Sequence, residues 1–236
     1  MKVKNYWRDI DSMLIELIRN GWVKLPSLTE FGLEDYFVKI SKDMEGKTFA
    51  ELVDGHKSLL EEIGVGECLA PRLLDIAQKI YGYKGELNNQ YHIARRVEPG
   101  NSKEMYRAHF DSHLFTLVLP IKIPETTSKG GAVGDLIYYP HARATPKNEV
   151  INFLGKAYYK RFASKAGLDK LSKHRTPFFD NFQDYRPLLF VGNTTLHTNK
   201  PVSVDCLNPR LTLLAHFFDP SPKYGIGNIV RYMRNR

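Results

Sequence analysis

The 236-residue chain contains only two cysteines, Cys68 and Cys206, and neither belongs to a C-x-x-C pair. A disulfide framework or a cysteine-based zinc site is therefore not expected. No apolar run approaches the roughly 20 residues that a membrane-spanning helix needs. The N-terminal stretch MKVKNYWRDIDSMLIEL is interrupted by charges and lacks the apolar centre of a signal peptide. These absences predict a soluble protein of a reducing, cytoplasmic compartment.

Several catalytic signatures are also missing. The chain has no G-x-S-x-G nucleophile elbow, no P-loop and no G-x-G-x-x-G dinucleotide fingerprint. Acidic residues are the scarcer charge, 26 against 34 basic residues, which gives a formal net charge of +8. This charge favours an anionic partner. Nucleic acid is a poor candidate, because no basic and aromatic stripe dominates the chain.

The first 85 residues have the spacing of amphipathic helices. Trp7, Ile10, Leu14 and Leu17 recur at three- and four-residue intervals, and Gly21 follows as a stop signal. Similar patterns predict further helices over residues 30–44, 47–63 and 67–81.

After Gly85 the pattern changes to short segments rich in β-branched and aromatic residues, bounded by Gly, Pro or Asn, which are strand signals. The predicted strands are QYHIARRV (90–97), LFTLVLPIKI (114–123), AVGDLIYY (132–139), PLLFVG (187–192), KPVSVDCL (200–207) and LTLLAHFF (211–218). Several short strands of this kind favour a sandwich or barrel. Residues 147–170 have helical periodicity and interrupt the strands, and the final YGIGNIVRYMRNR reads as a short basic helix or tail.

One short motif stands out. Residues 106–113, YRAHFDSH, place His109, Asp111 and His113 at alternate positions, which in a strand sends all three side chains to one face. Burying two imidazoles and a carboxylate is unfavourable unless something satisfies them. A metal ion would do so, and so would a local hydrogen-bond network.

Later features favour the metal. His197 follows an apolar segment and a polar turn, and Arg210-Leu211-Thr212 begins 13 residues further on. Two neutral imidazoles and one carboxylate form the facial site of non-haem Fe(II) oxygenases, with positions left open. A 2-oxoacid and O₂ can occupy those positions. Arg210 can clamp the far carboxylate of the oxoacid, and Thr212 shares strand parity with it.

This order of motifs resembles the Fe(II)/2-oxoglutarate-dependent oxygenases, and within them the phytanoyl-CoA dioxygenase-like branch. The resemblance covers 89–219 at low identity and includes NQYHIARRVEPG, HFDSH, GGAVGDLIYYPH, RPLLFVGNTTLHTNKPV and NPRLTLLAHFF. The N-terminal NGWVKLPSL also resembles the family's entry segment. The chain departs from the branch at its PGSH-like segment, which here reads YYPHARA around His141.

The resemblance implies a mainly β fold with flanking helices: a double-stranded β-helix (jelly-roll or cupin-like) core with N-terminal helices and a helical insertion. Residues 1–236 would form a single oxygenase domain. Its expected parts are a helical N-terminal support (1–85), a β-helix core (86–220) with an insertion at 142–186, and a basic C-terminal tail (221–236).

The resemblance also implies the site. His109, Asp111 and His197 would bind Fe(II), and together with Arg210 they form the expected catalytic set. Arg210 and Thr212 would hold the cosubstrate 2-oxoglutarate. A residue of the first core strand often adds a contact to this cosubstrate, and Tyr91 and Arg95 are the two candidates.

Four other histidine and cysteine positions have simpler explanations. His113 shares parity with the expected ligands, but a facial triad needs no third histidine, so it is expected beside the site. His92 and His216 lie in apolar strands and are expected as core histidines. Cys206 is expected as a small buried apolar residue, because no activating partner is evident.

The implied activity is a dioxygenase that hydroxylates or otherwise oxidises a C–H bond of a small, anionic or sugar-type substrate. It would use Fe(II), 2-oxoglutarate and O₂ and release succinate and CO₂. Asp111 favours hydroxylation over halogenation, which needs that position vacant. The alternative is a non-catalytic or cupin-type metal-binding β-helix protein that recognises an anionic ligand. The cupin-type protein would bind its metal through His109, His113 and His197 and use no oxoacid. Arg210 and Thr212 are then unexplained.

The substrate itself is not specified by these residues. Lys, Arg and Tyr side chains between 147 and 175 would select an anionic substrate if this segment forms a lid, whereas a solvated helix face explains them equally well. The basic, aromatic C-terminal tail leaves contact with a membrane surface open. The sequence indicates no oligomeric state.

Overall fold

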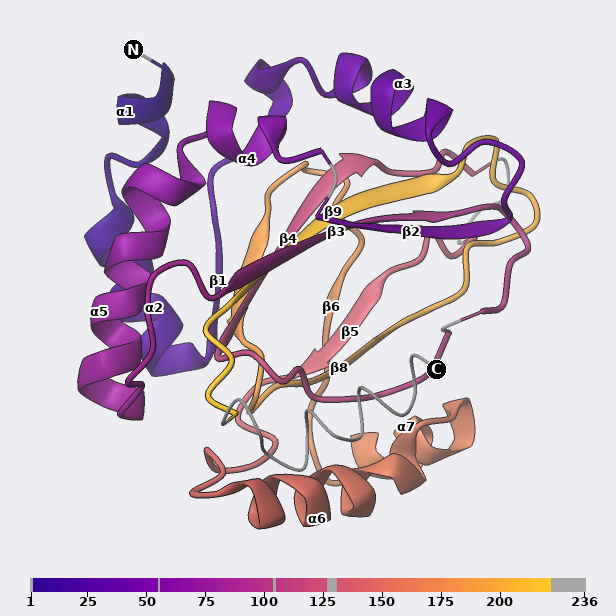
Figure 1. The fold of residues 1–236 in the computed structure, drawn as a ribbon. Coiled ribbons are helices and arrows are strands. Elements are labelled where there is room, and N and C mark those ends of the chain that lie inside the picture. The colour runs from indigo at the N-terminus through magenta and orange to yellow at the C-terminus, as the bar shows by residue number, and fades with distance from the viewer. Residues whose placement is uncertain (1, 55, 104, 127–130, 222–236) are drawn as a thin grey trace.

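The computed structural model describes residues 2–54, 56–103, 105–126 and 131–221. In this part of the chain two antiparallel sheets face each other, and helices lie outside both of them (Figure 1). The larger sheet has the strand order β1-β7-β4-β9-β3-β2, and the smaller has the order β6-β5-β8. This confirms the expected double-stranded β-helix with flanking helices.

The strands are short at the edges and long in the centre of the larger sheet. They are β1 (Trp22–Lys24), β2 (Phe49–Val53), β3 (Gln90–Val97), β4 (Phe115–Lys122), β5 (Leu136–Tyr139), β6 (Phe178–Asp180), β7 (Leu188–Val191), β8 (Leu196–Asn199) and β9 (Arg210–Phe217).

The helices form an N-terminal group and an insertion group. The N-terminal group is α1 (Lys2–Tyr6), α2 (Ile10–Asn20), the 3₁₀ turn η1 (Thr29–Phe31), α3 (Leu33–Lys42), α4 (Ser58–Glu62), the π-helical turn η2 (Val65–Leu69) and α5 (Ala70–Tyr81). The insertion group is α6 (Glu149–Tyr159), the 3₁₀ turn η3 (Lys160–Phe162) and α7 (Lys165–Ser172). None of the described helices is both long enough and apolar enough to cross a membrane.

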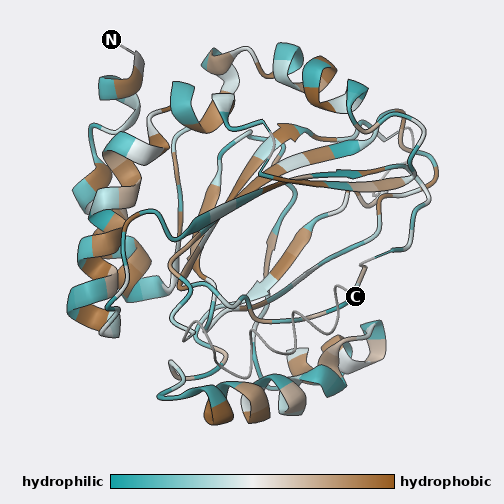
Figure 2. Ribbon diagram, in the orientation of Figure 1, coloured by the Kyte–Doolittle hydropathy of each residue, from teal (hydrophilic) through white to brown (hydrophobic). Residues whose placement is uncertain are grey.

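Alternation along the central strands separates two cores. In β9, Leu211, Leu213, Ala215 and Phe217 pack against the N-terminal helices, whereas Leu214 belongs to the core between the two sheets. The polar residues Arg210, Thr212 and His216 lie on the same face of β9 as Leu214. Their side chains therefore also point into the space between the two sheets. Figure 2 shows the hydrophobic residues of the sheets and of the N-terminal helices concentrated where these layers meet.

Local sequence features explain where the N-terminal helices form and where they end. In α2 the residues Ile10, Leu14 and Leu17 are buried on one face. The helix ends at Gly21, whose left-handed φ of 79° lets its N–H bond to the carbonyl of Leu17. The helix expected over 67–81 is present as η2 followed by α5.

Two predicted elements were wrong. The helix predicted over 47–63 is in fact strand β2 followed by the short α4, because residues 49–53 pair with β3, from Phe49 opposite Val97 to Val53 opposite Ile93. The strand predicted over 200–207 forms only isolated bridges, at Val202 and Cys206. The N-terminal region expected to be purely helical therefore supplies two strands, β1 and β2, to the larger sheet.

The insertion between β5 and β7 contains α6, η3 and α7 as expected, and it also contains β6, which pairs with β5. A third cluster of buried apolar side chains, including Phe110, Ile137 and Leu168, joins the smaller sheet to these helices. The expected C-terminal helix or tail lies outside the described residues.

Candidate metal centre

The backbone joins the two distant histidines directly. His109 and His197 form an isolated antiparallel bridge in which each N–H bonds to the carbonyl of the other at 3.0 Å. Two residues paired in this way project their side chains to the same side. Their ring centroids are accordingly 4.4 Å apart, although 88 residues separate them in the chain.

Asp111 completes a compact set of ligand atoms. Its Oδ1 lies 3.7 Å from Nε2 of His109 and 3.7 Å from Nε2 of His197. One ligand atom from each of the three residues lies within 4.8 Å of the others, and this is the one such cluster among the residues that the structure describes. The side chain of His197 is buried and that of Asp111 is 10% exposed, whereas half of the His109 side chain is exposed. The site is therefore open on the His109 side.

The protonation states suit a metal cation. Nδ1 of His109 bonds to the Arg107 carbonyl at 2.8 Å, and Nδ1 of His197 bonds to the Thr195 carbonyl at 3.2 Å. A carbonyl can only accept, so each Nδ1 carries a proton, and Nε2 is the nitrogen that each ring can offer to a metal. Desolvation by the surrounding residues, and then the nearby His197 ring, lower the pKa of His109 to about 4, although half of its side chain is exposed. The ring is neutral near pH 7.

Asp111 is held as a carboxylate. Burial acts to raise the pKa of Asp111, but His197, His216, His109 and a hydrogen bond from Thr116 outweigh it and hold this pKa below its usual range. Two neutral imidazoles and one carboxylate, with an open side, are the donor set that non-haem Fe(II) sites use. The residues present therefore fit an Fe(II) ion.

A hydrogen-bond chain fixes the orientation of the carboxylate. Thr116 donates from Oγ1 to Asp111 Oδ2 at 2.5 Å, and Nδ1 of His216 lies 3.1 Å from the same hydroxyl. The hydroxyl has one proton, which goes to the carboxylate, so His216 must donate from Nδ1. Thr116 and His216 lie opposite each other in the register of β4 and β9. Asp111 Oδ1 is left facing the two histidines.

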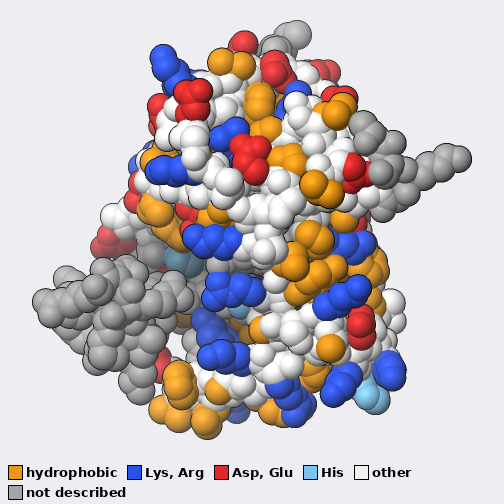
Figure 3. All heavy atoms as spheres, turned by 90° about the vertical axis from the view of Figure 1, so that its right-hand side faces the viewer, with side chains coloured by type: hydrophobic (Ala, Val, Ile, Leu, Met, Phe, Trp, Pro, Cys, Tyr) orange, Lys and Arg blue, Asp and Glu red, His pale blue; other side chains and the backbone are white. Residues whose placement is uncertain are grey.

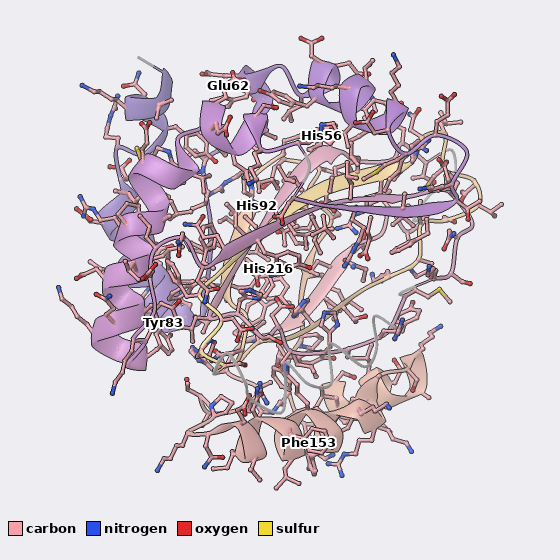
Figure 4. The ribbon with its side chains drawn as sticks, in the orientation of Figure 1. His56, Glu62, Tyr83, His92, Phe153 and His216 are labelled. Carbon is pink, nitrogen blue, oxygen red and sulfur yellow. The ribbon has the colours of Figure 1, made fainter. Side chains whose placement is uncertain are left out.

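Aromatic rings pack against His216, the last member of this hydrogen-bond chain. Tyr91 stacks on His216 and on His113, with centroid distances of 5.0 and 5.5 Å. His216 lies between the two sheets, whereas His92 and His56 lie toward the N-terminal helices (Figure 4). Burial lowers the pKa of His216 to about 3. His113 thus lies beside the ligand cluster but is not part of it.

A basic pocket lies near the other end of β9. Arg95, Lys103, Lys200 and Arg210 line it together with Asn199, and no acidic residue is among the lining residues that the structure describes. Figure 3 shows Lys and Arg side chains gathered along the middle of the face that it views. Arg95 pairs with Glu51 and Lys200 pairs with Asp135, so these two charges are balanced.

Arg210 differs from these neighbours. Its side chain is 4% exposed, and its guanidinium carbon lies 6.0 Å from the centroid of the Phe182 ring. The Arg210 side chain makes no hydrogen bond or ion pair within the described part of the chain. Burial, and then Arg95, lower the pKa of Arg210 to about 10, so it stays charged near pH 7. A buried cation of this kind is a candidate to bind an anion.

The other residues expected in the site lie near the metal ligands or near the basic pocket. Thr212 is buried beside the pocket, opposite Arg95 in the register of β3 and β9. Of the two candidates on β3, Arg95 lines the pocket with Arg210, whereas Tyr91 lies at the metal-centre end. The metal ligands do not line this pocket, although Asn199 follows His197 by two residues on β8.

Sequence reasoning missed Thr116 and Gly192. A side-chain carbon at Gly192 would lie 2.8 Å from Thr116 Oγ1 and 3.0 Å from Asp111 Cβ. The absence of a side chain therefore allows the backbone at Gly192 to pack against these two residues. The Gly192 carbonyl also accepts a hydrogen bond from the N–H of Asp111 at 3.1 Å. No local motif marks either residue, because both act through contacts between distant segments.

No family model matches the chain, and no curated protein matches it. Solved structures do share its fold. A Pseudomonas putida prolyl-4-hydroxylase has a TM-score of 0.52 at 13% identity, with 88% of this chain and 97% of that chain covered. The carbocyclase SnoK of nogalamycin biosynthesis, a non-haem α-ketoglutarate-dependent enzyme, has a TM-score of 0.53 at 11% identity, with 93% and 89% covered.

A third similar structure was solved with its iron and cosubstrate. The epimerase SnoN in complex with Fe³⁺, α-ketoglutarate and a nogalamycin has a TM-score of 0.51 at 11% identity, with 90% of this chain and 84% of that chain covered. The chain therefore has the double-stranded β-helix fold of Fe/2-oxoglutarate-dependent oxygenases. These comparisons do not test the resemblance to the phytanoyl-CoA dioxygenase-like branch, which stays a prediction.

Proposed function

We propose that this protein is an Fe(II)- and 2-oxoglutarate-dependent dioxygenase that oxidises a C–H bond of a small, anionic substrate. The observation that carries the proposal is the meeting of His109, Asp111 and His197, with both Nε2 atoms 3.7 Å from one carboxylate oxygen. The same fold occurs in α-ketoglutarate-dependent enzymes.

In this proposal His109, Asp111 and His197 hold the iron. Bound Fe(II), with 2-oxoglutarate and O₂, would supply the oxidising chemistry and release succinate and CO₂. The chain's own contribution is positional. Backbone pairing fixes the two imidazoles, the Thr116 hydroxyl fixes the carboxylate, and the open side at His109 admits the reactants.

Arg210 is proposed to bind the 5-carboxylate of 2-oxoglutarate. A buried guanidinium that forms no ion pair with any described carboxylate supports this role, because an anion would compensate its burial. Thr212 lies on the same face of β9 and can add a hydroxyl contact. Arg95 lines the pocket and is the better placed of the two β3 candidates, whereas Tyr91 supports His216 and His113.

The anionic substrate is proposed from Lys103, which lines the same pocket as Arg210, whereas Asp135 balances the charge of Lys200 there. The cupin-type alternative receives no support from the geometry. It needs His113 as a ligand, and among the described residues the ligand cluster comprises His109, Asp111 and His197.

Calorimetric titration of 2-oxoglutarate into the Mn²⁺-loaded protein, without O₂ turnover, tests the proposal. Arg210→Met should weaken 2-oxoglutarate binding by roughly 10-fold or more, because it removes a charge-assisted contact. Arg72→Met, at an exposed arginine on α5, is the matched control and should bind normally. Absence of 2-oxoglutarate binding to the folded, metal-loaded protein would contradict the proposed activity.

A further inference from the structure

Helix α6 presents its apolar face to solvent. Six of its eleven residues are exposed, and all six are apolar. The five large ones are between 48% and 61% exposed: Val150, Ile151, Phe153, Leu154 and Tyr158. The sixth is Ala157. Figure 4 labels Phe153 on α6, which lies at the edge of the molecule.

The opposite face of α6 is the one that contacts the rest of the protein. Asn152 accepts hydrogen bonds from Arg143 through both its carbonyl and its side-chain oxygen. Lys156 donates to the Ser112 hydroxyl at 3.2 Å, and Tyr159 packs edge-on against Phe110 at 5.0 Å. The usual arrangement of a surface helix, apolar side inward and polar side outward, is therefore reversed.

Cations surround this apolar face. Residues 143–175 contain nine Lys or Arg residues and two acidic ones, against a net charge of +8 for the whole chain. Exposed cations lie at both ends of α6: Lys147 before it, and Lys160, Arg161 and Lys165 after it. The Arg161 guanidinium lies over the Tyr158 ring at 3.6 Å.

We propose that α6 binds the surface of an anionic lipid bilayer. Its apolar side chains would enter the boundary between headgroups and acyl chains, while the flanking cations contact lipid phosphates. A protein partner fits less well, because lysine is depleted from protein interfaces. The proposal does not depend on the chemistry at the metal centre.

The lipid surface would lie close to the metal site. The partners of α6 on its inner face, Phe110 and Ser112, flank Asp111 in the chain. Substrate arriving from the bilayer surface would thus meet the candidate centre a few residues away from the docking helix.

Vesicle flotation of the full-length chain tests the proposal. The protein should float with vesicles of phosphatidylcholine and phosphatidylglycerol, and much less with phosphatidylcholine alone. The double substitution Phe153→Ser/Leu154→Ser should weaken binding at least about tenfold, since each removes a large apolar side chain. Lys160→Glu/Arg161→Glu should weaken binding to the anionic vesicles, and added salt should do the same.

The matched control is Ile15→Ser/Val38→Ser, which removes two equally exposed apolar side chains from α2 and α3. It should float like the unmodified protein, and circular dichroism checks that every variant is folded. The proposal is overturned if folded protein does not float with anionic vesicles, or if the α6 and control variants float alike. It is also overturned if Phe153→Ser/Leu154→Ser abolishes self-association in sedimentation velocity without changing vesicle binding, because α6 then binds a second copy of the chain.

Discussion

Thr116 Oγ1 donates a hydrogen bond to Asp111 Oδ2 at 2.5 Å, and it is itself 3.1 Å from Nδ1 of His216. The carboxylate therefore has one oxygen committed to β4 and the other free to face His109 and His197. Supporting contacts of this kind determine how well a ligand is oriented for its metal.

The first prediction concerns this hydroxyl. Thr116→Val keeps the shape of the side chain but removes the donor, so Asp111 loses its fixed orientation. Metal affinity should fall by roughly 10- to 100-fold, measured by anaerobic titration with Fe(II) or Co(II), and Thr116→Ser should restore most of it. Thr198→Val is the matched control, because the Thr198 hydroxyl is buried and has no hydrogen-bond partner among the described residues. Equal affinities for Thr116→Val and Thr198→Val would show that the hydroxyl has no role in metal binding.

The second prediction concerns Gly192. An added methyl group would meet Thr116 Oγ1 at 2.8 Å and the His113 carbonyl at 3.0 Å. Gly192→Ala should therefore reduce the free energy of unfolding by roughly 1–3 kcal/mol and weaken metal binding as well. Chemical denaturation and metal titration measure the two effects. Gly66→Ala, where nothing lies within 4 Å of the added carbon, should leave metal binding unchanged. Normal metal affinity in Gly192→Ala would show that the loop at Gly192 does not pack closely against Thr116 and Asp111.

The third prediction concerns pH. Burial lowers the pKa of His216 from 6.5 to about 3. Between these values the unfolded chain binds a proton that the folded protein does not, so the free energy of unfolding decreases as the pH falls below about 6.5. One such group contributes about 1.4 kcal/mol per pH unit.

His216→Phe should flatten that dependence in the metal-free protein, measured by urea denaturation at several pH values between neutrality and about pH 4. His174→Phe alters an exposed ring and should keep the slope of the unmodified protein. If the slope of His216→Phe matched that of the control, His216 would not be buried in its neutral form.

The sequence predicted the long strands and the polar motifs better than the edges of the sheets. The strand predicted over 90–97 matches β3 residue for residue, because its alternating apolar residues and flanking turn signals are local. Residues 47–63 looked helical because Phe49–Val53 has no strong strand pattern of its own. It becomes a strand through pairing with β3, which is a tertiary effect.

Some residues of the candidate site could be predicted from the sequence and others could not. His109, Asp111 and His197 could be proposed from sequence because the residue types and their order indicate metal chemistry. Thr116, His216 and Gly192 could not, since nothing near them in the chain indicates that β4, β9 and the loop after β7 meet at Asp111. The residue of β3 that contacts the cosubstrate could not be chosen from the sequence, which left Tyr91 and Arg95 as equal candidates. In the structure Arg95 lines the basic pocket, whereas Tyr91 lies against His216 at the metal-centre end of β3.

The central claim is that His109, Asp111 and His197 hold an iron ion that 2-oxoglutarate also binds. It is tested most directly by the visible absorption spectrum of the protein with Fe(II) and 2-oxoglutarate under anaerobic conditions. The account predicts a weak charge-transfer band that is lost in His109→Ala and His197→Ala and kept in His113→Ala, whose ring lies outside the ligand cluster. No band from folded protein at saturating Fe(II) and 2-oxoglutarate, or a band that disappears with His113 and survives loss of His109, would contradict it.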